Sequence, residues 1–280
     1  MNILYCGDGN IADGVLISVL SLLKNTSEPL SIYLLTASIE KGSTKISALT
    51  YEYADFLDKV VKKENPENKV TLLVITDMFL NQTPEANMQT RFTPCCMLRL
   101  YSDEIAQMPD KILYLDNDVI CRRDPLEFYN QNMSEYELAG ILDYYGSWFF
   151  YNHPPRRDYI NSGVLLLNLK KIRETGLFAK CREMCETEEM FMPDQSAINK
   201  LCKHKKICNR RYNEQRKLHN DTVFQHFTTS FRFLPWFHTV SVKPWNITGM
   251  HKTLKLHEYD DLLNQFTELK NLYNKEYVKL

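Results

Sequence analysis

The sequence shows no excess of charge of either sign and no long apolar run. Its 34 basic and 35 acidic residues give a net charge of −1, so the electropositive surface of a general nucleic-acid binder is not expected. No apolar stretch reaches the roughly 18 residues that a membrane span needs. Internal repeats and low-complexity tracts are also missing. These absences favour an ordinary soluble globular protein over a membrane protein or a nucleic-acid-binding one.

A secretory signal is not recognisable either. The first residues, MNILYCGDGN, contain no positively charged segment followed by a long apolar one. The eight cysteines are therefore expected to be reduced thiols of a cytoplasmic protein. A zinc site is the alternative for the set Cys181, Cys185, Cys202, His204 and Cys208, but its spacing matches no common zinc motif. Small apolar side chains on helices explain these cysteines more simply.

What the sequence does contain is an alternation of short apolar segments with longer helical patterns. Strands are predicted at residues 2–6, 30–36, 69–76, 111–118, 137–143, 159–169 and 222–227. Helices are predicted at residues 12–26, 47–63, 95–108, 169–189, 196–204 and 259–277. Residues 77–94 and 144–158 are expected to be loops. This alternation predicts an α/β fold whose largely parallel sheet is covered by helices on both faces.

No linker-like composition interrupts the chain. We therefore expect one domain over residues 1–250 and a C-terminal helical appendage over residues 251–280. The appendage mixes acidic and basic residues, whereas helices that lie on a membrane surface usually have a strongly basic polar face. A packed or dimer-forming helix is therefore favoured over a membrane-docking one.

A glycine-rich turn, GDGNIA, follows the first predicted strand. It fits the G-x-G-x-x-A pattern of dinucleotide-binding folds, so an NAD-type Rossmann oxidoreductase is one hypothesis. Asp8 and Asp13 argue against it, because they place negative charge where a pyrophosphate would meet the helix N-terminus. The second strand also ends without an acidic residue for the ribose. A tight turn with a capping aspartate, or a nucleoside base bound by Asp8, is the alternative.

Two aspartates, Asp116 and Asp118, stand at the end of the apolar segment KILYL. Alternate residues of a strand share a face, so both carboxylates are expected to project together beyond the strand end. Ligands bind at that edge in open α/β sheets. Two carboxylates so close repel unless a cation lies between them, and oxygen ligands suit Mg²⁺ or Mn²⁺. We predict a divalent metal site; a helix cap and an arginine pair are the simpler alternative.

Later segments offer partners for such a site. His226, in FQHF, is either a core histidine or a third metal ligand, and an imidazole ligand would favour Mn²⁺ over Mg²⁺. Asp194 and Gln195 open the helix in MPDQSAIN, where helix capping is the simplest interpretation. In KPW, Lys243 offers a point charge for phosphate and Trp245 a stacking surface.

In this order after CGDGN, the segments KILYLDNDV, YINSGVLLLNLKKIR, MPDQSAIN, QHF and VKPW resemble retaining glycosyltransferases of family 8. That family includes bacterial lipopolysaccharide galactosyl- and glucosyltransferases and glycogenin. The resemblance implies a GT-A nucleotide-diphospho-sugar transferase fold with a Rossmann-like sheet. It implies a hexosyltransferase that uses UDP-glucose or UDP-galactose, with Mn²⁺ or else Mg²⁺. The implied acceptor is a glycan, glycolipid or other hydroxyl compound, such as a bacterial surface polysaccharide.

The resemblance also implies roles for individual residues. The implied metal ligands are Asp116, Asp118 and His226, and the implied catalytic residues are Gln195, Asp194 and Asp143. The donor-binding residues are expected to be Asp8, Gly9, Asn10, Arg99, Asn117, Asn161, Ser162, Gly163, Lys243 and Trp245. Lys243 lies 17 residues after His226, further than in many family members, so Arg232 is an alternative contact for the diphosphate.

A mechanism follows from these assignments. The amide of Gln195 is a poor nucleophile, which favours front-face attack in which the leaving phosphate oxygen takes the proton of the acceptor. Asp194 or Asp143 as nucleophile is the competing hypothesis. Residues 144–159 and 232–237 are expected to form a lid that excludes water. A catalytically inactive carbohydrate-binding protein, peripheral association with the inner face of the membrane and a homodimer are further hypotheses.

Overall fold

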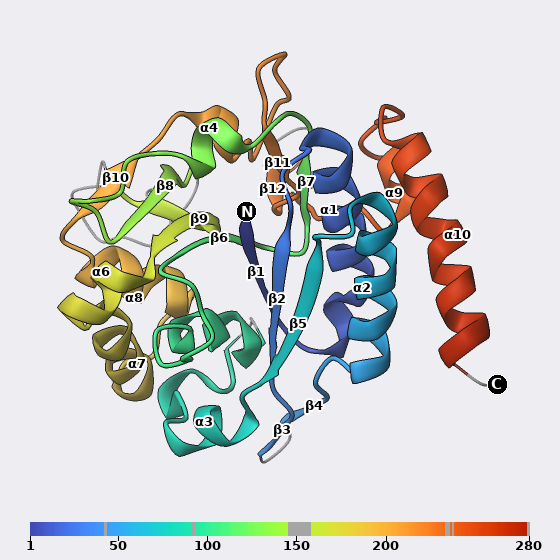
Figure 1. Cartoon of the computed structure of the whole chain (residues 1–280). Coiled ribbons are helices and arrows are strands. Elements are labelled where there is room, and N and C mark those ends of the chain that lie inside the picture. Colours follow the sequence, from blue (N-terminus) through green and yellow to red (C-terminus); the bar gives the residue numbers. More distant parts are fainter. Residues whose placement is uncertain (42–43, 91–92, 145–157, 233–235, 237, 279–280) are drawn as a thin grey trace.

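The computed structural model describes residues 1–280 except 42–43, 91–92, 145–157, 233–235, 237 and 279–280. A seven-stranded sheet forms its centre, in the order β10-β8-β9-β6-β1-β2-β5 (Figure 1). The strands are β1 (Asn2–Cys6), β2 (Ser31–Thr36), β5 (Lys69–Val74), β6 (Lys111–Leu115), β8 (Leu138–Leu142), β9 (Ile160–Asn168) and β10 (Lys205–Ile207). Strand β9 pairs antiparallel with β6 and β8, and the other neighbouring strands pair parallel. The predicted mostly parallel sheet is therefore confirmed, with one reversed strand.

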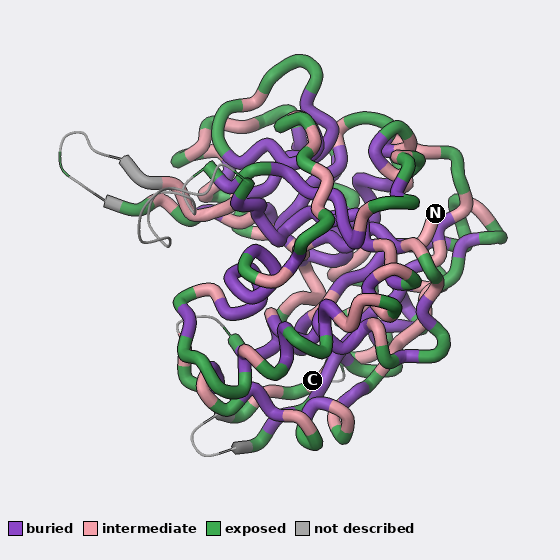
Figure 2. The backbone as a smooth tube through the Cα atoms, turned by 90° about the vertical axis from the view of Figure 1, so that its left-hand side faces the viewer, coloured by how far each residue is buried: buried purple, intermediate pink, exposed green. Residues whose placement is uncertain are grey.

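Successive side chains of the sheet enter two apolar layers, because strand residues point alternately to its two faces. In β1, Ile3 and Tyr5 belong to one layer and Leu4 to the other. Helices α1 (Ala12–Asn25) and α2 (Tyr51–Glu64) cover the first layer. The second is covered by η3 (Pro94–Tyr101), a 3₁₀ helix, and by α7 (Leu177–Thr187) and α8 (Pro193–Leu201). Figure 2 shows this buried centre inside an exposed periphery.

Several shorter elements surround the sheet. The remaining helices of the described residues are α3 (Thr76–Asn81), α4 (Leu126–Tyr129), α6 (Leu169–Thr175), α9 (Ile247–Lys252) and α10 (Asp260–Tyr277), with 3₁₀ helices η1 (Gly9–Ile11), η2 (Glu85–Asn87) and η4 (Arg210–Tyr212). Three antiparallel pairs are β3 (Ile39–Lys41) with β4 (Thr44–Ile46), β7 (Val119–Cys121) with β11 (Phe224–His226), and β12 (Ser230–Arg232) with β13 (His238–Val240). The β7–β11 pair joins segments about a hundred residues apart in the sequence. It brings His226 next to the turn that follows β6.

The C-terminal helix α10 lies against the outer side of α1 and α2 (Figure 1). Its residues Leu262, Leu263 and Phe266 are buried in the first apolar layer. The ring of Tyr273 lies 5.8 Å from that of Tyr53 in α2. The expectation of a packed helix is therefore met, while the domain boundary at residue 250 stays a prediction. Within the part of the chain that the structure describes, none of the helices is both long and apolar enough to cross a bilayer.

Several sequence-based predictions differ from the structure. The helix predicted at residues 169–189 is divided at Gly176 into α6 and α7. The predicted helix at residues 95–108 is a 3₁₀ helix that ends at Tyr101, where the amide and the hydroxyl of Ser102 both donate to the Arg99 carbonyl. The predicted loop at residues 77–94 contains α3 and η2. The strand predicted at 111–118 ends at Leu115, so both aspartates lie in the following turn. The loop at 144–158 falls almost entirely outside the described residues.

Candidate active site

The predicted site residues gather at one edge of the sheet. The carboxyl ends of β1, β6 and β8 meet there, and the reversed β9 adds its amino end. An open cavity of about 410 Å³ lies at this edge, a size that suits a small-molecule ligand. Twelve of the predicted residues line it: Asp8, Arg99, Asp116, Asn117, Asp118, Asp143, Asn161, Ser162, Asp194, Gln195, His226 and Lys243. The fold therefore brings together residues that are spread over most of the chain.

The three predicted metal ligands lie side by side. The turn after β6 is closed by the Val119 amide, which donates to the Asp116 carbonyl at 3.2 Å, and His226 pairs with Val119 across β7–β11. Nε2 of His226 is 3.2 Å from Oδ1 of Asp118 and 3.6 Å from Oδ2 of Asp116. All three ligand atoms lie within 4.8 Å of one another. The carboxylates thus converge through a turn, and not through the pleat of one strand as the sequence reasoning assumed.

The imidazole of His226 is held in the orientation that a metal ligand needs. Its Nδ1 lies 3.1 Å from Oδ1 of Asn213, and the Asn213 amide donates to Oδ1 of Asn161 at 2.8 Å. Since the Asn213 oxygen can only accept, Nδ1 carries a hydrogen, and Nε2 is the ring nitrogen that faces the carboxylates. Asn213 was missed in the sequence, because it stands in no motif and no spacing links it to His226.

Gly163 allows His226 to approach strand β9. A Cβ atom at this position would lie 2.1 Å from Cε1 of His226 and 2.7 Å from Oδ2 of Asp116. Real side chains do not approach so closely, and both neighbours are fixed by other contacts. The glycine in the segment NSG is therefore required for the close packing of His226 and Asp116, although it does not itself line the cavity.

Lys243 supplies a positive charge next to the carboxylates. Its ammonium group pairs with Oδ2 of Asp118 and donates to the Phe227 carbonyl at 2.8 Å. Burial opposes the ionisation of Asp118, but the charges of Lys243 and His226 outweigh it and hold the pKa of Asp118 well below its usual range. Asp118 therefore keeps its negative charge. The side chain of Arg232, the alternative phosphate contact, lies outside the described part of the structure.

Arg99 links Asp116 to the neighbouring helix α8. Its guanidinium lies 3.1 Å from Oδ1 of Asp116 and 3.3 Å from Oδ2 of Asp194. It also lies over the ring of Tyr114, 3.9 Å from the centroid, and Tyr114 donates to Asp116 at 2.5 Å. Burial keeps the pKa of Tyr114 well above its usual value, so its hydroxyl remains a donor. Arg99 thus lines the cavity and also positions two carboxylates, while its predicted contact with the donor stays a prediction.

Both the nitrogen and the oxygen of the Gln195 side-chain amide are hydrogen-bonded. Its Nε2 donates to Oδ2 of Asp143 at 2.8 Å, and its Oε1 accepts from the Ser162 amide at 2.9 Å. Asp194 accepts from the Ser162 hydroxyl at 3.2 Å. Helix α8 begins after Met192 without a side-chain cap, so neither residue caps it, although Asp194 lies in the first turn. Both side chains instead belong to a buried polar network on the cavity wall.

The glycine-rich turn reaches the cavity through Asp8. This buried carboxylate accepts from the Asn10 amide at 3.0 Å and caps η1. Gly9 and Asn10 are exposed and are not part of the cavity wall, and neither is Trp245, whose ring lies near Gly14. The wall residues that sequence reasoning missed come from several segments and include Cys95, Cys96, Tyr114, Phe191, Met192, Gln215 and Thr228.

The cysteines do not form the alternative zinc site. Cys181, Cys185 and Cys202 are buried in the second apolar layer, and burial raises the pKa of Cys185 to about 12. None of the candidate metal groups found among the described residues contains a cysteine. These thiols act as small core residues, as the simpler interpretation predicts.

Comparison with known proteins settles the family. A model of glycosyl transferase family 8 matches residues 2–249. The chain belongs to glycosyl transferase family 8. This assignment replaces the oxidoreductase hypothesis that the glycine-rich turn raised, in agreement with the acidic residues in that turn.

Relatives of this family 8 chain act on lipopolysaccharide according to their names. The lipopolysaccharide 1,2-glucosyltransferase of Escherichia coli is 22% identical, over 99% of this chain and 87% of its own. The lipopolysaccharide 1,3-galactosyltransferase of Salmonella typhimurium is 22% identical, over 89% of this chain and 74% of its own. The chain spans less than two thirds of the length of two other curated relatives.

A solved structure supports the fold. The galactosyltransferase LgtC in complex with donor and acceptor sugar analogs matches with a TM-score of 0.66 and 18% identity, over 96% of this chain and 95% of that one. The predicted family and the GT-A fold are thereby confirmed, and the relatives support a hexosyltransferase.

Proposed function

We propose that this chain is a metal-dependent retaining hexosyltransferase that moves glucose or galactose from a UDP-sugar to a hydroxyl acceptor. The observation that carries the proposal is the convergence of Asp116, Asp118 and His226 beside a fixed polar network in one cavity. Family membership supplies the reaction class, and the site supplies the reason to expect a divalent ion.

The donor set fits Mn²⁺ better than Mg²⁺. Asp116 and Asp118 offer hard oxygen atoms, while the Nε2 lone pair of His226 suits a softer ion. Lys243 already balances part of the carboxylate charge, which supports the proposal that these carboxylates attract a cation. When bound, Mn²⁺ acts as a Lewis acid and stabilises the charge on the departing diphosphate.

Lys243 is the residue that we assign to the diphosphate. Its side chain lines the cavity, and its ammonium group pairs with Asp118, one of the three candidate metal ligands. A point charge on a flexible stem can turn from a carboxylate to a phosphate oxygen without moving the backbone. Arg232 stays the alternative contact, as a prediction from the sequence.

The polar network favours front-face attack. Gln195 presents an amide that is a poor nucleophile, and Asp194 is bound by Arg99 and by the Ser162 hydroxyl. Gln195 and Asp143 then orient the sugar while the leaving phosphate oxygen accepts the acceptor proton. If Asp194 or Asp143 were the nucleophile, a glycosyl adduct on that aspartate would be detected by mass spectrometry of the Gln195→Ala variant held with donor alone.

The acceptor that we propose is a glycan or glycolipid of the bacterial surface. The lipopolysaccharide transferases of Escherichia coli and Salmonella typhimurium to which the chain is similar support it. An acceptor of this kind would place the enzyme in the cytoplasm at the inner face of the membrane. A homodimer stays a prediction, since α10 already packs within its own chain.

The test is Mn²⁺-dependent release of UDP from a panel of UDP-sugars. We expect turnover with UDP-glucose or UDP-galactose, its loss on chelation, and at least a roughly 100-fold lower rate for Asp118→Asn, because a ligand and a buried charge are removed together. Asp110→Asn is the matched control, since Asp110 is 70% exposed and lies outside the cavity. No Mn²⁺-dependent turnover with any donor would instead support a carbohydrate-binding protein without activity.

A further inference from the structure

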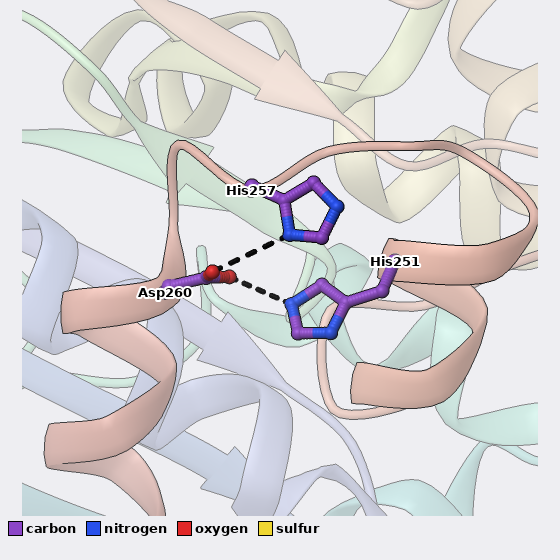
Figure 3. A group of neighbouring side chains, drawn as sticks. All are labelled: His251, His257 and Asp260. Atoms are coloured by element: carbon purple, nitrogen blue, oxygen red, sulfur yellow. Dashed lines mark hydrogen bonds and ion pairs between the residues drawn. The ribbon is translucent and has the colours of Figure 1, made fainter.

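A second group of metal-binding side chains lies outside the cavity, at the start of the C-terminal helix. Figure 3 shows His251, His257 and Asp260 facing one another. His251 belongs to α9, Asp260 is the first residue of α10, and His257 lies in the segment between these helices. None of these three residues has a part in the hexosyltransferase site, so the group calls for a separate explanation.

The three side chains present ligand atoms at close range. Nε2 of His251 is 2.7 Å from Oδ1 of Asp260, and Nδ1 of His257 is 3.4 Å from Oδ2 of the same carboxylate. All three ligand atoms lie within 4.8 Å of one another. Ligands of a tetrahedral zinc ion, at about 2.0–2.1 Å from the metal, lie roughly 3.3 Å apart. The group is therefore close to the required spacing, and the His251–Asp260 pair has to open by a few tenths of an ångström.

We propose that His251, His257 and Asp260 form a second divalent-metal site, selective for an ion that prefers imidazole, such as Zn²⁺. Two nitrogens and one oxygen are a ligand set typical of zinc, with water in the fourth position. The exposed fractions of the side chains are 33%, 64% and 41%, so an ion and its water have access from solvent.

The backbone between the helices holds the ligands in place. The amide of Leu256 donates to the Met250 carbonyl at 3.0 Å, and the amide of Asp260 donates to the His257 carbonyl at 3.1 Å. Lys255 has a φ of 55° in this segment, a left-handed conformation that a non-glycine residue adopts only when its surroundings fix it. The connection is thus a defined turn, and the ligands need little ordering when an ion binds.

The two imidazoles stack against each other and face the same carboxylate (Figure 3). Their ring centroids lie 4.5 Å apart at an interplanar angle of 20°. The stacking places a nitrogen of each ring beside Asp260, which is the arrangement that a shared ion requires. The nearby Glu258 is engaged by Arg122, which leaves Asp260 as the carboxylate of the group.

An ion at this site would join two parts of the molecule. Helix α9 continues the segment that carries Lys243, and α10 packs on α1 and α2. Zinc would therefore tie the C-terminal helix to the segment that reaches into the cavity. We expect it to stabilise the folded chain without taking part in sugar transfer.

The experiment counts Zn²⁺ ions per chain by isothermal titration at pH 7.5. The parent is expected to bind two ions, His226→Ala and His257→Ala one each, and the double variant none. His204→Ala is the matched control, because His204 is exposed and belongs to neither candidate metal group of the described residues, and it should still bind two. The variants share every cysteine with the parent. Any zinc bound by thiols is therefore the same in each protein and does not affect the difference in zinc count between them.

A thermal measurement guards against misfolding of a variant. Saturating Zn²⁺ should raise the Tm of His226→Ala by about 5 °C, and it should leave the Tm of the double variant unchanged. The proposal is overturned if His226→Ala binds no zinc, or if adding His257→Ala to it changes neither the zinc count nor the Tm shift. Either result would mean that the three side chains form only an ion-pair network. Neither result depends on whether the chain releases UDP.

Discussion

At the scale of single residues, the orientation of one imidazole depends on an amide behind it. Asn213 accepts from Nδ1 of His226 and thereby directs Nε2 toward Asp116 and Asp118. Partners of this kind commonly change metal affinity by about 10–100-fold when they are removed. Asn213 is thus a positioning residue, which acts on the metal only through His226.

Replacing Asn213 should therefore change the metal requirement. Asn213→Ala is expected to raise the Mn²⁺ concentration for half-maximal UDP release by about 10–100-fold, with a smaller change in kcat at saturating Mn²⁺. Asn213→Asp keeps an oxygen that accepts from Nδ1 and should restore most of the affinity. A lower kcat with an unchanged Mn²⁺ requirement would show instead that Asn213 acts through its bond to Asn161.

At the scale of secondary-structure elements, the site depends on how closely two strands approach. Strand β9 passes His226 at the position of Gly163, where a methyl group has no space. Gly176, between α6 and α7, differs in kind: it has a φ of 65° and nothing within 4 Å of a Cβ atom. Gly163 is needed because a side chain would clash with His226, and Gly176 because of its left-handed backbone conformation.

This contrast gives a paired prediction. Gly163→Ala should reduce Mn²⁺ binding, measured by titration, by at least about tenfold, because the new Cβ displaces His226. Gly176→Ala should leave Mn²⁺ binding unchanged and lower the free energy of unfolding by about 1–2 kcal/mol, the cost of a left-handed alanine. Unchanged Mn²⁺ binding in Gly163→Ala would mean that the strand can move away from the histidine at low cost.

The elements differ in how well the sequence predicted them. Helices α1, α2 and α10 were predicted within a few residues, because each has a regular apolar face. Helix α2 begins at Tyr51 and not at residue 47, since Thr50 caps it. The 3₁₀ helix η3 was predicted as a longer helix, since side-chain bonds decide its geometry. The reversed direction of β9 leaves no mark on its own residues, as a strand buried on both faces looks alike in either direction.

The site was partly predictable for the same reasons. Asp116, Asp118, His226 and Gln195 stand in short motifs with a recognisable chemistry, and the fold brings them together. Asn213 and Tyr114 could not be selected, because their roles arise from contacts between distant segments. The metal-binding group His251, His257 and Asp260 was missed because its spacing matches no common motif.

At the scale of the whole molecule, the ion pair in the cavity connects catalysis with stability. Lys243 and His226 hold the pKa of Asp118 below its usual range against the cost of burial. A carboxyl group with a lowered pKa stabilises the folded protein at pH values above the pKa in the unfolded chain, about 3.9, and loses this contribution as the pH falls toward the folded-state pKa.

Replacing Lys243, the partner of Asp118, should change how the free energy of unfolding depends on pH. Lys243→Met is expected to lower the free energy of unfolding at pH 7 by about 2–3 kcal/mol, because it leaves Asp118 charged and buried without its lysine. The difference from the parent should shrink as the pH falls from 7 to 3.5, since protonation of Asp118 in the variant removes the unpaired charge. Urea unfolding at several pH values, without divalent metal, measures this difference.

An exposed ion pair provides the control for this experiment. Lys200 pairs with Glu188 at 2.8 Å on the surface, so Lys200→Met should change the stability by less than about 1 kcal/mol at every pH. A difference for Lys243→Met that stays constant between pH 7 and 3.5 would contradict the role given to the charge of Asp118.

The pairing of β7 with β11 also sets the order in which the site is completed during synthesis. His226 follows Asp118 by 108 residues. At about 5–20 residues per second, roughly 5–20 s separate the emergence of the carboxylates from that of the imidazole. A nascent chain therefore has its first three parallel strands well before Asp116, Asp118 and His226 can come together. The site can be completed only after β11 has been synthesised, so sugar transfer has to wait for that strand.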